Sequence, residues 1–190
     1  TNPTHLKLYQ DLLGNGDNLG ISINYKIQQN PRWLPQAFII AEKFINREPV
    51  CLNLGDHIFF GNDVTKKLKK NINNFSKTTI FAYNSNKYKE YGVINFDKNN
   101  KPISIIEKPN KSKSKSIVCG LYCYDQNVVE FSKKLKFSNR DELEISDLNN
   151  IYLKNKSLNI EMINDKNYWI DAGRPKKILQ ASKLVSTLEK

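Results

Sequence analysis

Residues suited to covalent or thiolate chemistry are scarce in this sequence of 190 residues. The two histidines, His5 and His57, form no Cys/His spacing typical of a zinc site. No Gly-x-Ser-x-Gly segment accompanies them, which argues against a Ser-His-Asp hydrolase. There are only three cysteines and no Cys-x-x-Cys pair. Because Cys51, Cys119 and Cys123 lie in or beside β-branched and aromatic runs, we expect buried, reduced thiols in a cytoplasmic protein.

Long apolar runs and arginines are also missing. The longest apolar runs, such as 103–106, are far too short to cross a bilayer, and no charged-then-apolar leader opens the sequence, so we expect no membrane partner. Only four of the 30 basic residues are arginines, although the net charge is +11. The lysines are spread among many asparagines, as a compositional bias would produce. We therefore expect a basic site for phosphorylated substrates and no nucleic-acid partner.

The sequence does contain a regular alternation of helix and strand patterns, with no internal repeat and no long linker. Helix patterns fall at 3–13, 34–45, 63–75, 128–135, 145–153 and from 175 onward. Strand patterns fall at 21–27, 49–54, 78–83, 92–96, 103–106, 117–124, 158–163 and 168–170. This order predicts one α/β domain over 1–190, with a mostly parallel sheet and an added antiparallel hairpin. Functional residues then belong at the carboxyl ends of the strands.

Two aspartates follow such strands, and each has a glycine nearby. Asp56 comes after the apolar segment 52–54, and Asp171 comes after 168–170. Together, two carboxylates can hold one Mg²⁺ against phosphate oxygens, because this hard cation takes oxygen ligands. Taken singly, each aspartate is equally well explained as a turn or helix-capping residue.

Other polar residues at strand ends allow a sugar-binding or a purely structural interpretation. Lys108 can neutralise a sugar phosphate and Glu107 can accept hydrogen bonds from sugar hydroxyls, but the pair is also typical of a surface turn. Tyr91 and Gly92 open a strand, where glycine lets a ligand approach the backbone. The acidic segment 142–147 begins a helix, where its charges favour the helix dipole.

Taken in order, these segments resemble glucose-1-phosphate thymidylyltransferases over nearly the whole sequence. The most specific are Gly-Asp-x-Ile-Phe-x-Gly at 55–61 and Glu-Leu-Glu-Ile-x-Asp at 142–147. The others are Gln28 with 31–42, 91–93, 107–109, 120–122 and 169–173.

The resemblance implies a Rossmann-like nucleotidyltransferase sheet and attack of glucose 1-phosphate on the α-phosphorus of dTTP, giving dTDP-glucose and pyrophosphate. It implies that Asp56 and Asp171 hold Mg²⁺ and that Lys108 acts with them in catalysis. It assigns the sugar phosphate to Lys108 and Arg140, and the thymine to Gln28. The glucose pocket is then formed by Tyr91, Gly92, Glu107, Val118 and Tyr122. Members are commonly homotetramers; whether the product feeds rhamnose or another deoxysugar stays open.

The sequence departs from the family pattern in several places. The glycine-rich loop with its Arg, the following Lys-x-x-x-Pro stretch, the first central strands and the C-terminal extension have no counterpart in these 190 residues. Trp33 stands where the family has a glycine at the base site, and Ala172 replaces a threonine. Two hypotheses follow: a partial sequence of an active enzyme, or a non-catalytic remnant that binds sugar nucleotide or pairs with homologous subunits.

Overall fold

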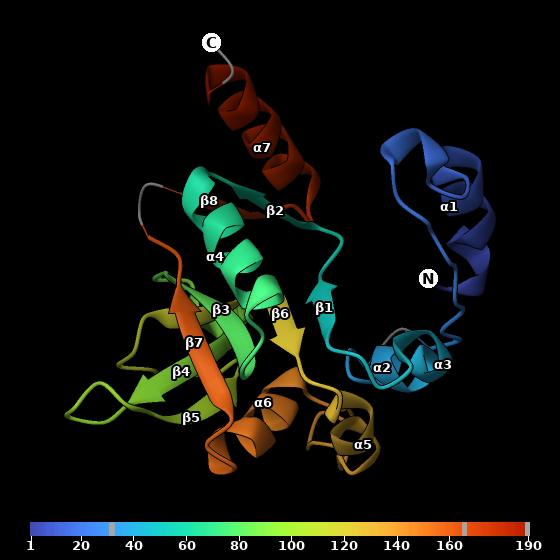
Figure 1. Cartoon of the computed structure of the whole chain (residues 1–190). Helices are drawn as coiled ribbons and strands as arrows, with labels where there is room; N and C mark the ends of the chain where they lie inside the picture. The colour runs from blue at the N-terminus through green and yellow to red at the C-terminus, as the bar shows by residue number, and fades with distance from the viewer. Residues whose placement is uncertain (31–32, 165–166, 189–190) are drawn as a thin grey trace. The chain divides into compact units, whose positions relative to one another are not determined.

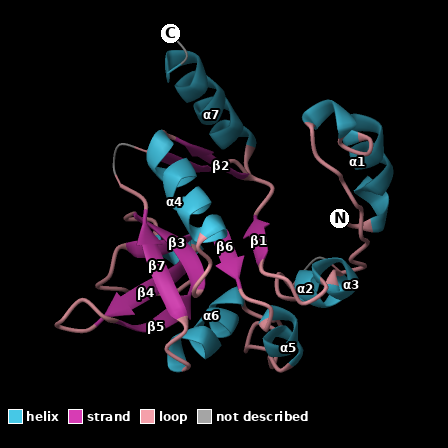
Figure 2. Cartoon of the chain, in the orientation of Figure 1, coloured by secondary structure: helices cyan, strands magenta, loops and turns pink. Residues whose placement is uncertain are grey.

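The computed structural model describes residues 1–30, 33–164 and 167–188 and has an α/β architecture (Figures 1 and 2). Its helices are α1 (Leu6–Leu13), α2 (Gln36–Ile40), α3 (Glu42–Ile45), α4 (Asn62–Asn73), α5 (Val128–Lys133), α6 (Ile145–Lys154) and α7 (Pro175–Leu188). Its strands are β1 (Val50–Asn53), β2 (His57–Phe60), β3 (Thr78–Asn84), β4 (Gly92–Phe96), β5 (Pro102–Glu107), β6 (Ser116–Tyr124), β7 (Leu158–Met162) and β8 (Tyr168–Asp171).

The chain forms two compact units, each built from two segments. One unit comprises Thr1–Glu48 and Gln126–Leu148, and the other comprises Pro49–Asp125 and Asn149–Lys190. The eight strands found among the described residues all belong to the second unit. No helix within the described residues is long and apolar enough to cross a membrane.

The main sheet of the second unit is organised around β6. Its strand order is β5-β4-β6-β3-β7, and β1 also pairs with β6. Because β1, β3 and β4 all run antiparallel to β6 while β7 runs parallel to β3, these four strands share one direction. The α/β class and the β4–β5 hairpin are confirmed. The expectation of mostly parallel pairing is wrong, because β6 separates co-directional strands and only β3–β7 is a parallel pair among the described strands.

The core of this unit lies between β6, β3 and helix α4. Every residue of β6 except Ser116 is buried, which matches its continuous apolar run rather than an alternating pattern. Val64 and Leu68, one helical turn apart on α4, pack with Phe81 of β3 and Cys119 of β6. The Tyr124 hydroxyl donates a 2.6 Å hydrogen bond to Oδ1 of the buried Asn149 side chain.

In the first unit, the predicted helices are confirmed and the predicted strand is wrong. Helix α1 ends at Gly14, whose φ is 57°, and the predicted helix 34–45 appears as α2 and α3 with a break at Ala41. Helix α2 packs against α5. The strand predicted over 21–27 is wrong. Ile21 and Ile23 donate their N–H groups to the carbonyls of Gly16 and Asn15, and the Lys26 carbonyl accepts from the N-terminal amine of Thr1, so the alternating residues have no strand partner within the described chain.

Two further expectations are corrected in the second unit. The sequence does not predict β2, because its four residues follow a turn directly and are too few to show an alternating pattern. Strand β2 pairs antiparallel with β8. Cys119 and Cys123 are buried free thiols, as expected, but Cys51 is exposed. It lies on the outward face of β1, whose residues alternate between half-buried and exposed.

A bulge in β6 brings the turn after β1 against the sheet. The β3–β6 register shifts between Ile80 and Ala82, and Gly120 in the bulge has a φ of 73°. The Gly120 carbonyl accepts a 3.0 Å hydrogen bond from the Leu54 N–H. A Cβ at Gly120 would overlap the His57 ring and lie 2.9 Å from Leu54 Cδ1. Only glycine therefore allows both the left-handed backbone and the approach of residues 54–57.

We expect Gly120→Ala to lower the free energy of unfolding by about 2 to 4 kcal/mol, from backbone strain and from overlap with His57. Urea unfolding followed by circular dichroism measures this loss. Gly55→Ala is the matched control, since Gly55 has no atom within 4 Å of an added Cβ, and it should change stability by less than about 1 kcal/mol. Equal effects of the two substitutions would contradict the role given to the bulge.

Candidate metal and phosphate site

The pairing of β2 with β8 brings the two predicted metal aspartates together. In this ladder His57 lies directly opposite Asp171. The Ala172 N–H donates a 2.7 Å hydrogen bond to the Asp56 carbonyl, which extends the ladder by one residue. One ligand atom from each of Asp56, His57 and Asp171 lies within 4.8 Å of the others. Residues 115 positions apart in the sequence thus form one cluster.

Hydrogen bonds from neighbouring residues stabilise the ionised form of Asp171. Burial raises the pKa of this carboxyl, but the Gly173 N–H, the Tyr91 hydroxyl and the nearby His57 and Lys177 outweigh it, and the net pKa is lowered. The Gly173 N–H lies 3.1 Å from Oδ1 and the Tyr91 hydroxyl 2.8 Å from Oδ2. Burial and the bond to Asp171 together raise the pKa of Tyr91, so this hydroxyl keeps its proton and donates.

The cluster suits a divalent cation. Two carboxylates and an imidazole are all established ligands of such ions. A Cβ on Gly173 would lie 2.8 Å from Asp56 Oδ2 and 3.2 Å from Asp171 Oδ1, so this glycine keeps the space beside both carboxylates free. Asp56, half of whose side chain is exposed, can turn toward a shared ion.

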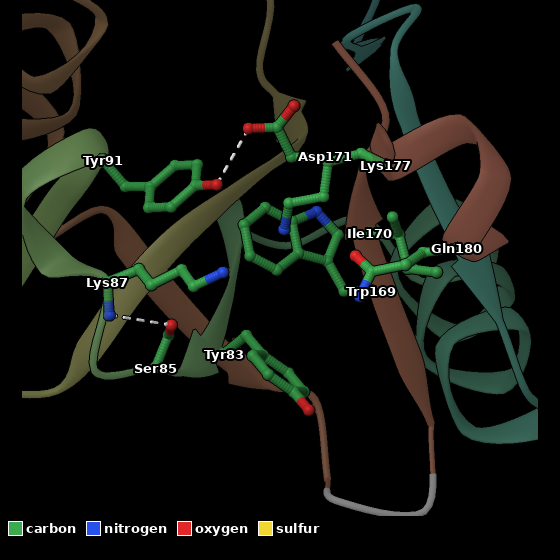
Figure 3. Close-up of a pocket in the computed structure, with 9 residues that line it drawn as sticks. All are labelled: Tyr83, Ser85, Lys87, Tyr91, Trp169, Ile170, Asp171, Lys177 and Gln180. Atoms are coloured by element: carbon green, nitrogen blue, oxygen red, sulfur yellow. Dashed lines mark hydrogen bonds between the residues drawn. The ribbon is translucent and has the colours of Figure 1, made fainter. Parts of the chain in front are cut away.

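A cavity of about 390 Å³ adjoins Asp171 and is lined by two lysines (Figure 3). The ammonium groups of Lys87 and Lys177 both point into it, beside the ring of Trp169. Partial burial and the neighbouring Lys87 lower the pKa of Lys177, which shows the mutual repulsion of the two cations. Such a cavity favours an anion, and phosphate is the natural class. No local pattern in the sequence distinguishes Lys87 and Lys177 from the many other lysines.

The residues predicted for the sugar pocket gather at one end of the β4–β5 hairpin. Gly92 and Glu107 are cross-strand partners, and the exposed Lys108 donates its N–H to the Tyr91 carbonyl at 3.0 Å. Tyr122 of β6 is 3% exposed; burial and the Glu107 carboxylate raise its pKa. Val118 is likewise buried, so little of either β6 side chain is accessible to a ligand.

The remaining predicted residues belong to the first unit. Gln28 lines a cavity of about 290 Å³ and donates to the Trp33 carbonyl at 2.9 Å and to Gln36 Oε1 at 2.7 Å. Arg140 forms ion pairs with Glu142 and Glu144 at 2.7 and 2.9 Å, so acidic residues already surround its guanidinium.

The side chain of Trp33, for which the resemblance implies a glycine, contacts Asp141 and Phe137. Its indole N–H donates to the Asp141 carbonyl at 3.1 Å, and its ring meets Phe137 edge-on with centroids 5.0 Å apart. The neighbouring residues 31 and 32 of the resembling segment lie outside the described residues.

Comparison with known proteins gives a consistent result. The family model for nucleotidyl transferases matches residues 1–187. The chain is 43% identical over 189 residues to a glucose-1-phosphate thymidylyltransferase of Neisseria meningitidis, covering 100% of this chain and 66% of that protein. It is 38% identical over 187 residues to a Xanthomonas campestris protein of the same name, covering 98% and 63%.

Solved structures of nucleotidyltransferases are also similar to this chain. A Bacillus anthracis protein assigned as a glucose-1-phosphate thymidylyltransferase, crystallised with sucrose, has a TM-score of 0.85 at 33% identity, covering 97% of this chain and 73% of that chain. A UDP-glucose pyrophosphorylase structure has a TM-score of 0.78 at 20% identity, covering 95% and 73%, and supports the fold alone.

The chain belongs to the nucleotidyl transferase family, with the nucleotidyltransferase fold. The resemblance to glucose-1-phosphate thymidylyltransferases predicted from the sequence is confirmed. The chain spans slightly less than two thirds of the length of these curated relatives, 66% and 63%.

We expect Tyr91→Phe to raise the pKa of Asp171, because the ionised carboxylate loses a hydrogen-bond donor. A lowered native pKa stabilises the fold above the unfolded pKa, and this contribution disappears as the pH falls through the native pKa. Carboxyl-carbon NMR titration of the metal-free protein measures the shift. Tyr168→Phe serves as the control, because Tyr168 lies on β8 with Asp171 but is half exposed. It should leave the titration of Asp171 unchanged. An unchanged Asp171 titration in Tyr91→Phe would refute the assignment.

Proposed function

We propose that the protein transfers a thymidylyl group from dTTP to glucose 1-phosphate, forming dTDP-glucose and pyrophosphate. The observation that carries this proposal is the convergence of Asp56 and Asp171 beside a lysine-lined cavity. The names of the relatives at 43% and 38% identity supply the substrates.

In the proposed reaction, a phosphate oxygen of glucose 1-phosphate attacks the α-phosphorus of dTTP while the bond to the β-phosphate oxygen breaks. No covalent enzyme intermediate forms, so the protein positions the substrates and neutralises charge. Asp56 and Asp171 would hold Mg²⁺, which when bound withdraws charge from the phosphate oxygens. Tyr91 and Gly173 keep Asp171 ionised and oriented for this task.

The remaining roles follow the resemblance. The resemblance assigns the sugar phosphate to Lys108 and to Arg140, whose guanidinium is paired with two glutamates. Gln28 would contact the thymine. The glucose pocket would be formed by Tyr91, Gly92, Glu107, Val118 and Tyr122.

Lys87 and Lys177 add a further positive pair to this proposal. Their cavity ends at Asp171, so a phosphate there can meet both ammonium groups and the cation held by the aspartates. Homo-oligomeric assembly, a cytoplasmic location and supply of dTDP-glucose to deoxysugar synthesis also belong to the proposal, because the resemblance alone supports them.

We expect Asp56→Asn and Asp171→Asn each to reduce kcat by about 10²- to 10⁴-fold, because each removes a carboxylate from the metal site. Pyrophosphate release from dTTP and glucose 1-phosphate measures the rate, with UTP as competing nucleotide. The 190-residue chain and the complete product of its gene are assayed in parallel. Asp11→Asn on α1 is the control with unchanged activity. Sugar-nucleotide binding without any turnover in both proteins would favour the non-catalytic alternative instead.

We expect Lys87→Gln and Lys177→Gln each to raise the KM of a phosphorylated substrate by about tenfold with a smaller change in kcat, as loss of one charged hydrogen bond predicts. Initial rates at varied dTTP and glucose 1-phosphate identify which phosphate uses the cavity. Lys98→Gln in the β4–β5 turn is the matched control. Unchanged KM values for both substrates in both variants would exclude the cavity as a substrate site.

A further inference from the structure

The cluster of Asp56, His57 and Asp171 contains one residue, His57, that has no role if the bound cation is Mg²⁺ with oxygen ligands alone. Its side chain is 6% exposed. The ring meets Trp169 edge-on, with centroids 5.4 Å apart and an interplanar angle of 73°. Nδ1 lies 2.9 Å from the Cys119 carbonyl on β6, while Nε2 lies 3.7 Å from Asp56 Oδ1. The imidazole is therefore fixed on one edge and directed toward the carboxylates with the other.

The Cys119 carbonyl determines which ring nitrogen carries the proton. A carbonyl can only accept, so the 2.9 Å contact assigns the proton to Nδ1. The Trp169 indole N–H also points to Nδ1 and would require the opposite tautomer, but it lies farther away, at 3.3 Å. With the proton on Nδ1, Nε2 is left unprotonated, 3.7 Å from Asp56 Oδ1. Metal-binding histidines are typically held by such a bond from their other nitrogen to a backbone carbonyl.

The spacing of the donors permits one shared ion. Atoms bound to a common divalent cation at about 2.1 Å lie roughly 3 to 4 Å from one another. The three donors here lie within 4.8 Å, and the half-exposed Asp56 carboxylate is free to close the difference. His57 and Asp171 need no backbone movement, because the β2–β8 ladder already places them opposite each other.

A nitrogen donor changes which cation such a site prefers. Mg²⁺ takes oxygen ligands almost exclusively and keeps several waters. Mn²⁺ and the later divalent transition metals accept imidazole beside carboxylate. Two aspartates alone therefore suit Mg²⁺, whereas two aspartates with a histidine favour a transition metal.

We propose that His57 Nε2 is the third protein ligand of the cation held by Asp56 and Asp171, and that the site consequently prefers Mn²⁺ to Mg²⁺. The inference rests on the metal site of the proposed function but concerns a different ligand and a different choice of metal. Asp56 and Asp171 would supply charge, and His57 would supply selectivity.

The test is direct metal binding by the full chain without substrate. Calorimetric titration compares Mn²⁺ with Mg²⁺, and pulsed EPR of the Mn²⁺-loaded protein detects a directly bound imidazole nitrogen. We expect the wild-type protein to bind Mn²⁺ at least about tenfold more tightly than Mg²⁺ and to show the nitrogen signal. His57→Asn should lose about 10- to 100-fold in Mn²⁺ affinity, lose the nitrogen signal, and change Mg²⁺ affinity by less than about threefold.

His5→Asn is the matched control, since His5 is the other histidine of the chain and is exposed in its N-terminal turn. It should keep both the Mn²⁺ affinity and the nitrogen signal. Tight Mn²⁺ binding by the wild-type protein without a nitrogen signal overturns the role of His57, even if His57→Asn fails to fold. Unchanged Mn²⁺ binding in Asp56→Asn and Asp171→Asn would instead overturn the metal site of the proposed function.

Discussion

The four-residue ladder between β2 and β8 is the interaction on which the candidate site depends. It joins the turn after β1 to the segment that precedes α7, two parts of the chain more than a hundred residues apart. Its register sets His57 opposite Asp171, and one further backbone bond holds Asp56 beside Ala172. A one-residue slip would turn these side chains to the other face, so register and site geometry are the same constraint.

Bringing two carboxylates together costs electrostatic energy, and the surrounding residues show how the fold offsets it. Like charges at this range raise each other's pKa unless opposite charges or donors intervene. Around Asp171 the donors prevail, since the Tyr91 hydroxyl and the Gly173 N–H both favour its ionised form. Across the adjoining cavity, Lys87 and Lys177 repel each other in turn. In the proposed reaction, a cation at the aspartates and a phosphate between the lysines would relieve both imbalances together.

The sequence allowed prediction of residues whose local pattern carries their role. Asp56 and Asp171 were recognisable because an apolar strand precedes each, and the β4–β5 hairpin because its turn and alternation are local. The direction of β6 could not be predicted from the sequence, since strand pairing depends on contacts between residues far apart in the chain. The same limit hid β2, the exposure of Cys51 and the cavity lysines, none of which differs locally from many similar residues.

The bulge at Gly120 links the stability of the sheet to the chemistry of the cluster. Because this residue has no side chain, the His57 ring can lie against β6 and donate to the carbonyl of Cys119. That bond fixes the tautomer and leaves Nε2 unprotonated beside Asp56. The backbone conformation of one glycine in the core strand thus controls the orientation of a ligand on the neighbouring ladder. A Cβ at this position would meet both the imidazole and Leu54, so the same glycine controls the orientation of the ring and the approach of the turn that carries Asp56.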